Sequence, residues 1–295
     1  ELDSKILVLE LKKEKDDLIK QIQSNNFQLE SEVSKRKEEL AATNERLFEG
    51  LRYAKKIQKS ILSDRRILKD VFSDVMIFYK PLDIVSGDFY FFKRIGNKVI
   101  IAAFDCTGHG VPGAILSMLG SSTLDNLVTG QVSRPSQLLI AVNNKLHEVL
   151  NSEGETNDGM DGCILLYNLD TQKLSYCGAN SSMIYFINGE RIRVRGNRLS
   201  LGDNYIAEDQ NVNQENFDAR EISSIYLFSD GFKDQINASC TEKFNTKRFN
   251  DLLSQIHTED FENQKEMLGD ELSRWRGSTH QVDDIMILGF KMFAQ

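Results

Sequence analysis

Hydrophobic and polar residues follow two different patterns along this chain, and the pattern changes near residue 64. Up to residue 62, apolar residues recur every seven positions, which is the period of a long helix that packs against another helix. From about residue 74, short runs of β-branched and aromatic residues alternate with turn residues, as is typical of strands. We therefore expect a helical domain over residues 1–64 and a globular domain over residues 65–295.

The N-terminal repeat predicts a parallel coiled coil that joins two copies of the chain. One row of the seam is apolar except at Asn26, and a buried asparagine in such a row fixes the register of a parallel dimer. The other row is weakened by Arg36, Thr43 and Gly50, so this seam is suited to changing its packing. The alternative is a single helix that packs on its own domain. The predicted dimerisation residues are Ile19, Ile22, Asn26, Leu29, Val33, Leu40, Leu47, Ala54, Ile57 and Ile61.

The rest of the chain predicts an α+β domain of antiparallel sheets covered by helices. Turn pairs at Gly96-Asn97 and Asn188-Gly189 connect strands as hairpins. Hairpins with grouped helices favour antiparallel sheets over a doubly wound parallel sheet. The expected strands lie within residues 74–82, 88–105, 162–180, 182–196, 223–231 and 283–293, and the expected helices span residues 113–129, 136–150, 247–256 and 262–274.

Composition narrows the class of protein further. The chain has 295 residues and is 40% hydrophobic, enough for a sizeable core, and no run approaches the roughly 20 apolar residues of a membrane span. Its four cysteines lack metal-binding spacing, which suits a reducing cytosol, and its net charge of −8 disfavours nucleic acid as a partner. Because the chain begins with Glu1, we expect a fragment of a longer cytoplasmic protein, with a membrane tether only through a missing N-terminal region.

Aspartates stand at the ends of four predicted strands. Asp88 opens one strand, Asp105 and Asp230 end two others, and Asp283 with Asp284 opens the last. One such aspartate is ordinarily a turn residue or a helix cap. If all four ends meet at one edge, however, the repulsion between the carboxylates requires a cation. Oxygen ligands of this kind suit Mg²⁺ or Mn²⁺ rather than Zn²⁺.

The motifs around these aspartates carry a family resemblance. "SGDFY", "DCTGHG", "SDG" and "DD" occur in the order found in the SpoIIE-type, RsbU-like branch of the metal-dependent protein phosphatases, the PPM or protein phosphatase 2C-like superfamily. The resemblance extends over residues 70–292. It implies a β-sandwich of two antiparallel sheets flanked by helices, with two Mn²⁺ or Mg²⁺ ions at one edge.

The resemblance also implies metal-binding roles for five residues. Asp105 would bridge both ions, and the backbone carbonyl of Cys106 would bind one of them. Asp88 would belong to the shell of the second ion, directly or through a water. Asp230 and Asp283 would hold the first ion. Of these five residues, Asp88 and Asp105 are the expected catalytic residues.

Several other residues keep two interpretations. Asp158 and Asp161 either bind an additional metal ion or form a polar turn, and Lys80 either binds phosphate or is a solvated lysine. His109 is either a general acid, since its pKa is ordinarily near neutrality, or a structural hydrogen-bonding residue. Met286 stands near where the family has a hydroxyl residue, a departure that we expect to affect packing rather than ligation.

The resemblance implies a phosphatase reaction without a covalent intermediate. A water activated by two divalent cations attacks phosphorus in line, while the cations offset charge on the phosphoryl oxygens. The implied substrate is phosphoserine or phosphothreonine on a regulatory protein, with an anti-sigma-factor antagonist as the typical partner. Gly108 and Gly110 are expected to let the backbone fold around a cation. The alternative is a non-catalytic coiled-coil signalling module whose phosphatase-like head only binds a partner.

Overall fold

The computed structural model describes residues 2–151, 158–207 and 210–293, and the side chains from residue 11 onward within these ranges. The chain divides into two compact units, Glu1–Tyr53 and Ala54–Gln295. The first unit is the greater part of helix α1 (Leu2–Ile61), and the last two turns of this helix belong to the second unit. The long N-terminal helix is therefore as predicted.

The apolar row of the predicted seam is exposed within the single chain up to Leu47, whereas Ala54 and Ile61 are half-buried. Val33, Leu40 and Leu47 each expose between 52% and 61% of their surface, and Asn26 is exposed in the same row. A regular apolar row that stays in solvent is what a coiled-coil seam presents before its partner binds. Dimerisation through this row stays a prediction.

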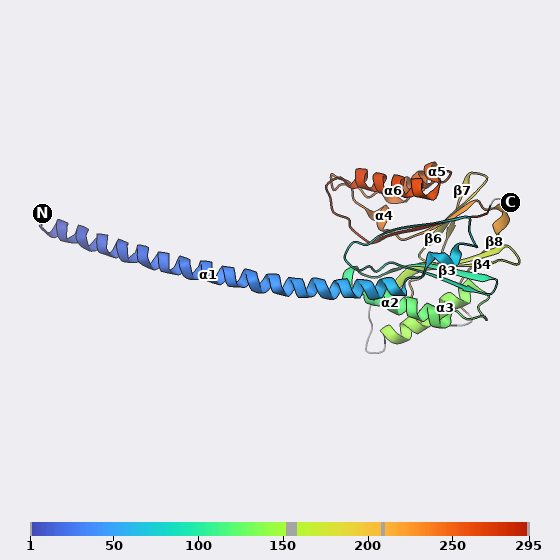
Figure 1. Ribbon diagram of the computed structural model, residues 1–295, viewed down its shortest axis with the longest axis horizontal. Coiled ribbons are helices and arrows are strands. Elements are labelled where there is room, and N and C mark those ends of the chain that lie inside the picture. Colours follow the sequence, from blue (N-terminus) through green and yellow to red (C-terminus); the bar gives the residue numbers. More distant parts are fainter. Residues whose placement is uncertain (1, 152–157, 208–209, 294–295) are drawn as a thin grey trace. The chain divides into compact units, whose positions relative to one another are not determined.

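The second unit, which we call the head, is a sandwich of two five-stranded antiparallel sheets (Figure 1). The first sheet has the order β1-β10-β9-β6-β7 and the second has the order β2-β3-β4-β5-β8. This arrangement confirms the predicted fold. The strands are β1 (Asp74–Lys80), β2 (Phe89–Ile95), β3 (Lys98–Cys106), β4 (Met160–Asn168), β5 (Lys173–Ala179), β6 (Ser182–Ile187), β7 (Glu190–Arg195), β8 (Glu215–Asp218), β9 (Ser224–Phe228) and β10 (Ile285–Lys291).

Helices cover the outer faces of both sheets. Helices α5 (Asn245–Ile256) and α6 (Phe261–Arg276) pack on the first sheet, and α2 (Gly110–Leu127) and α3 (Pro135–Leu150) pack on the second (Figure 1). One apolar core lies between the sheets, and one lies under each helix pair. Strand β3 is consequently covered on both faces, which explains why residues 99–104 form an uninterrupted apolar run.

Four short elements lie outside the predicted set: η1 (Arg65–Leu68), strand β8, η2 (Ala219–Glu221) and α4 (Gly231–Asp234). Three or four residues are too few to show a period, and β8 pairs with only one neighbour at the edge of its sheet. The predicted hairpin at Asn188-Gly189 is present, with both residues at positive φ. No helix in the described ranges is both long enough and apolar enough to cross a membrane.

The strand register brings the predicted aspartates to one end of the sandwich. The β2–β3 pairing places Asp88 beside Asp105, and the β3–β4 pairing sets Asp105 opposite Asp161. In the other sheet, the β9–β10 pairing places Asp230 near Asp283. Both sheets therefore contribute carboxylates to the same end of the head.

Candidate functional site

Asp88 is the most deeply buried carboxylate of the site, with none of its surface exposed. Its Oδ2 accepts a hydrogen bond of 2.7 Å from the Ser229 hydroxyl. Its Oδ1 has no hydrogen-bond partner among the described residues. A buried carboxylate oxygen without a partner is unfavourable unless a cation or a water reaches it. This oxygen is therefore free to act as a ligand.

Asp105, Asp230 and Asp283 line one cavity of about 250 Å³, which we call the carboxylate cavity. Asp105 is half-buried near the end of β3, Asp230 is exposed at the start of α4, and Asp283 is half-buried just before β10. Cys106 lines the same cavity. The structure thus brings these four residues of the predicted set to one place, with Asp88 buried next to Asp105.

Asp284 has a different position from its neighbour Asp283. It is buried, and its two carboxylate oxygens accept hydrogen bonds of 2.7 Å from the backbone N–H groups of Leu82 and Gly87. Both oxygens are thereby used to hold the loop that leads to Asp88. The first acid of "DD" therefore faces the cavity, whereas the second anchors the backbone.

The carboxyl groups perturb one another strongly. Burial raises the pKa of Asp88 well above its ordinary value of 3.8, and nearby negative charges raise it further. The pKa of Asp105 rises to about 10, first because of burial and then because of the negative charge of Asp88. Burial and the charge of Asp230 raise the pKa of Asp283. Carboxyl groups crowded in this way are stable either protonated or bound to cations.

The turn after β3 folds back as its glycines predict. Gly108 and Gly110 have φ values of +79° and +65°, in the region that favours glycine. Two further glycines allow backbone segments to meet there. A Cβ on Gly87 would lie 2.8 Å from the Gly108 carbonyl oxygen, and one on Gly113 would lie 2.2 Å from it. The loop before Asp88, the turn and α2 are therefore in backbone contact.

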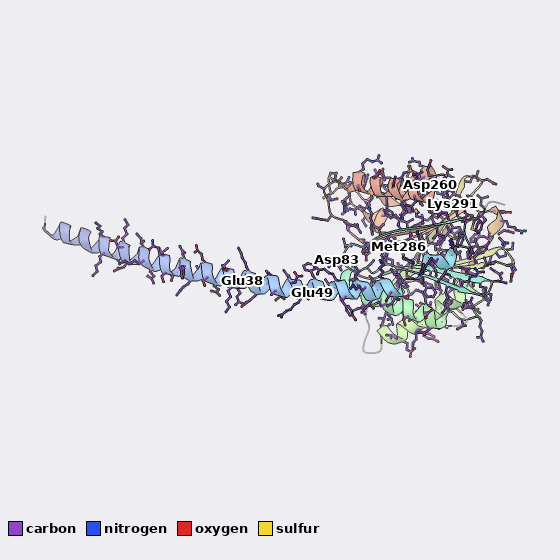
Figure 2. All side chains as sticks on the ribbon, viewed as in Figure 1. Glu38, Glu49, Asp83, Asp260, Met286 and Lys291 are labelled. Carbon is purple, nitrogen blue, oxygen red and sulfur yellow. The ribbon has the colours of Figure 1, made fainter. Side chains whose placement is uncertain are left out.

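Two side chains of this turn look reactive, but neither is placed as a nucleophile. The Cys106 thiol is buried, and burial raises its pKa well above the ordinary value, so it stays a thiol rather than a thiolate. His109 Nδ1 lies 2.9 Å from Asp83 Oδ2, and this contact raises the pKa of His109. The exposed pair ties the turn to the loop that carries Asp83, which is labelled in Figure 2.

Of the two aspartates predicted for an additional metal, one lies at the site. Asp161 lines the carboxylate cavity, and its Oδ1 accepts hydrogen bonds from Ser200 Oγ at 2.7 Å and Asn180 Nδ2 at 3.2 Å. Asp158 is exposed and does not line this cavity. An additional metal at these residues stays a prediction.

Lys80, for which the sequence left phosphate binding or solvation open, is not among the residues that line the carboxylate cavity. Its Nζ is 5.2 Å from the centre of the Phe78 ring, and a Cβ on Gly269 of α6 would lie 3.9 Å from it. Met286, labelled in Figure 2, is buried in the core between the sheets. Its backbone N–H donates a 3.0 Å hydrogen bond to the Ser229 hydroxyl. Ser229 therefore supplies a hydroxyl group beside the buried aspartate, and it was not among the predicted residues.

A second cavity adjoins the first and contains two cations that the sequence pattern does not single out. This cavity of about 110 Å³ shares Asp105, Asp161 and Asp230 with the carboxylate cavity, and Arg193 and Lys233 also line it. Arg193 belongs to an alternating, exposed strand, and Lys233 follows Asp230 by three residues. Their shared location depends on the pairing of β6 with β7 and β9, which is not visible in the sequence.

The donor set fits a hard divalent cation. Its donors are carboxylate oxygens, which Mg²⁺ and Mn²⁺ prefer, and the buried Oδ1 of Asp88 has no hydrogen-bond partner among the described residues. In the part of the chain that the structure describes, no three acidic, histidine or cysteine side chains are grouped closely enough to hold a metal ion as they stand. The fit therefore rests on donor chemistry and on the Asp88 oxygen.

Comparison with solved structures identifies the fold as that of the PP2C-like protein phosphatases. The SiaA-PP2C domain of Pseudomonas aeruginosa matches with a TM-score of 0.76 and 29% identity, over 86% of this chain and 100% of that one. A crystal structure of RsbX in complex with magnesium matches with a TM-score of 0.51 and 16% identity, over 74% of this chain and 94% of that one.

The family model for stage II sporulation protein E (SpoIIE) matches residues 95–293, more than half of the chain. The chain therefore belongs to the SpoIIE family. The match includes Asp105, Asp230 and Asp283, whereas Asp88 precedes it. The phosphoserine phosphatase RsbU of Bacillus subtilis (strain 168) is 24% identical over 183 residues, which are 60% of this chain and 51% of that protein. The chain thus spans about half the length of this curated relative.

Proposed function

We propose that the head is a metal-dependent protein serine/threonine phosphatase that hydrolyses phosphoserine or phosphothreonine on a cytoplasmic regulatory protein. The observation that carries this proposal is the partnerless Oδ1 of buried Asp88, next to a cavity lined by Asp105, Asp230 and Asp283. A divalent cation relieves both the unpaired oxygen and the repulsion between these carboxylates. The relative RsbX holds magnesium on a similar fold, which supports Mg²⁺ or Mn²⁺.

Two such ions, when bound, supply an activated water and offset the charge on the phosphoryl group. Asp105 has neighbouring carboxylates from both sheets, so it is the residue suited to bridge the ions. Ser229 occupies one oxygen of Asp88 and leaves the other for an ion, directly or through a water. The Cys106 carbonyl and the carboxylates of Asp230 and Asp283 complete the proposed set. No side-chain nucleophile is needed.

The proposed substrate class follows from relatives of this chain. RsbU is named a phosphoserine phosphatase, and the SpoIIE-type family acts in bacterial regulatory switching. A phosphorylated regulatory protein of the anti-sigma-factor antagonist type is therefore the proposed partner. Nucleic acid is not a proposed partner, because the chain is acidic.

Phosphate release from a phosphoserine protein, with Mn²⁺ or Mg²⁺ and then with chelator, tests this proposal. We expect turnover that needs the metal, stops with chelator and returns when metal is added in excess. The competing function is a coiled-coil module whose head only binds its partner. Turnover at no metal concentration, together with stable binding of a phosphorylated partner, would favour that function.

We further propose that α1 regulates the head as a homodimeric coiled coil. The support comes from Gln58, which lies in the part of α1 that folds with the head and is 6% exposed. Its side-chain amide donates to the Ser86 carbonyl and to Ser117 Oγ on α2, at 2.6 Å and 2.9 Å. Ser86 lies two residues before Asp88. A change in α1 therefore has a short hydrogen-bonded route to a proposed metal ligand.

A further inference from the structure

The second cavity contains two positive side chains that are not ion-paired. Arg193 Nη2 donates a 3.0 Å hydrogen bond to Ser182 Oγ, and Lys233 Nζ lies 5.5 Å from the centre of the Phe228 ring. Among the described residues, neither side chain forms an ion pair within 4.0 Å, although thirteen such pairs occur elsewhere in the same ranges. Neither cation is thus held in a direct ion pair, although the negative charges of Asp230, Asp234 and Asp105 act on Lys233.

Burial distinguishes Lys233 among the cations of the head, whereas Arg193 lies on an exposed strand. Lys233 is half-buried, and burial lowers its pKa as well as that of Arg193. A partly desolvated cation without a directly paired anion is unfavourable, and an anion that enters the cavity reduces this penalty. Arginine and lysine together suit a tetrahedral or planar oxyanion, because arginine presents a fork of donors and lysine a point charge.

The acidic residues that line the same cavity have other partners or roles. Asp161 uses Oδ1 for the hydrogen bonds from Ser200 and Asn180. Asp105 and Asp230 face the carboxylate cavity, where the proposed cations balance their charge. The cavity has a volume of about 110 Å³, so a phosphate or a carboxylate group fits in it.

We propose that Arg193 and Lys233 form an oxyanion subsite that holds a substrate oxyanion beside the proposed metal centre. This inference rests on the proposed phosphatase function, because the cavity shares Asp105 and Asp230 with that centre. Two groups of the substrate carry suitable oxygens, namely the phosphoryl group itself and an acidic side chain next to the phosphorylated residue. Either one would be held by the same two cations.

The test compares the wild type with Arg193→Gln and Lys233→Met, the second of which keeps an apolar stem beside Phe228. Inorganic phosphate binding is measured calorimetrically on the full chain with Mn²⁺, and turnover is measured on para-nitrophenyl phosphate and on phosphopeptides with and without a flanking acid. Each substitution should weaken phosphate binding, or raise KM for the acidic peptide, by about ten-fold, the size expected when one charge-assisted hydrogen bond is lost.

Mn²⁺ binding provides a readout that general damage to the site cannot imitate. Loss of a positive charge beside the carboxylates should leave Mn²⁺ affinity unchanged or make it tighter, whereas a disturbed site would bind both ligands more weakly. Arg191→Gln is the matched control, because Arg191 lies on the same strand but donates to Ser254 Oγ on α5 at 2.8 Å. Weaker phosphate binding assigns the subsite to the phosphoryl group, and a loss confined to the acidic peptide assigns it to the flanking acid.

Two results would overturn the subsite. One is unchanged phosphate binding and KM in both variants, and the other is a parallel loss of Mn²⁺ and phosphate binding. Because phosphate binding is measured without turnover, an inactive wild type would contradict the proposed function and still leave the subsite testable.

Discussion

Gln58 and Ser86 are joined by a pair of hydrogen bonds between α1 and the loop before Asp88. The Gln58 amide donates to the Ser86 carbonyl at 2.6 Å, and the Ser86 N–H donates to Gln58 Oε1 at 3.2 Å. Since Gln58 also donates to Ser117, this one side chain holds a helix end, a loop and α2 together. Ser63, just beyond α1, adds a hydrogen bond of 2.8 Å from the Phe92 N–H.

Gln58→Ala should loosen this connection. The substitution leaves the buried Ser86 N–H without its partner and removes one of two donors to the Ser86 carbonyl, to which Ser117 Oγ also donates at 3.3 Å. We therefore expect a loss of unfolding free energy of about 1–3 kcal/mol. If the connection controls the metal centre, the Mn²⁺ concentration for half-maximal turnover should also change several-fold. Gln23→Ala is the control, since Gln23 is an exposed glutamine of the same helix. A less stable protein with an unchanged Mn²⁺ requirement would show that Gln58 is only structural.

Asp105→Asn should abolish metal-dependent turnover and stabilise the metal-free protein. The pKa of Asp105 is about 10 in the folded head and ordinarily 3.8, so the folded state binds this proton more tightly than the unfolded state. The corresponding stability is fully present below pH 3.8 and is lost as the pH rises toward about 10. In chelator at pH 7.5, the asparagine variant should be more stable than the wild type by several kcal/mol, since each pKa unit corresponds to about 1.4 kcal/mol.

Urea unfolding in chelator at pH 6, 7.5 and 9 measures this effect. The stability of the wild type should fall with pH more steeply than that of Asp105→Asn. Substantial Mn²⁺-dependent turnover in the variant would contradict the two-metal proposal. Equal pH slopes would show that the Asp105 carboxyl is not perturbed in the metal-free head.

Asp283 and Asp284 should respond to the same substitution in opposite ways. Asp283→Asn removes a proposed ligand on the cavity wall, so it should abolish or greatly weaken Mn²⁺-dependent turnover with little loss of stability. Asp284→Asn removes an acceptor for the Leu82 and Gly87 N–H groups, and it should cost about 1–3 kcal/mol of stability even in chelator. Calorimetry of Mn²⁺ binding and urea unfolding measure the two effects separately. If Asp283→Asn lost stability and Asp284→Asn lost Mn²⁺ binding instead, the roles assigned to the two residues would be exchanged.

The sequence predicts the parts of this molecule that depend on local pattern. Strand alternation, the Asn188-Gly189 hairpin and the glycines of the turn after β3 each require a conformation that short stretches specify. The aspartates were predictable as a site because each motif places one at a strand end. That these ends meet at one edge of a two-sheet sandwich followed from the family resemblance rather than from periodicity, and the order of strands in the sheets was not predicted.

The remaining site residues were not predictable because tertiary contacts determine their environment. Gln58 stands between Ile57 and Lys59 like any exposed helical glutamine, yet the head buries it. Ser229 is one hydroxyl residue in "FSDG", and only the position of Asp88 makes it a partner. Lys80 kept two interpretations in the sequence for the same reason, since only tertiary contacts place its amine 5.2 Å from the centre of the Phe78 ring.

Asn26→Leu tests the predicted dimer. Replacing a buried asparagine in the seam by leucine should stabilise association and loosen the register or the number of helices. Light scattering at tens of micromolar and sedimentation should show a dimer for the wild type and a tighter or mixed assembly for the variant. Asn25→Leu is the control on a neighbouring helix position that lies outside both predicted rows. A monomeric wild type at these concentrations would refute the dimer.

Insertions in α1 test whether the coil regulates the metal centre or only tethers the head. Four residues inserted after Leu47 rotate the upstream helix by about 40° relative to the downstream turns, whereas seven residues nearly preserve the phase. Downstream of the insertion, the hydrogen bonds of Gln58 to Ser86 and Ser117 provide the connection to the head. A rotation that reaches this connection would shift the loop before Asp88.

The apparent Mn²⁺ requirement should therefore change several-fold with the four-residue insertion and little with the seven-residue insertion. The physical reason is that a site assembled from several carboxylates loses affinity after a small shift of one ligand. Metal titrations of turnover, repeated with Gln58→Ala combined with each insertion, test whether the effect passes through Gln58. In the Gln58→Ala background, the two insertions should have the same Mn²⁺ requirement. If neither insertion nor deletion of residues 1–50 alters turnover or Mn²⁺ dependence, α1 is a tether, and the path through Gln58 carries no regulation.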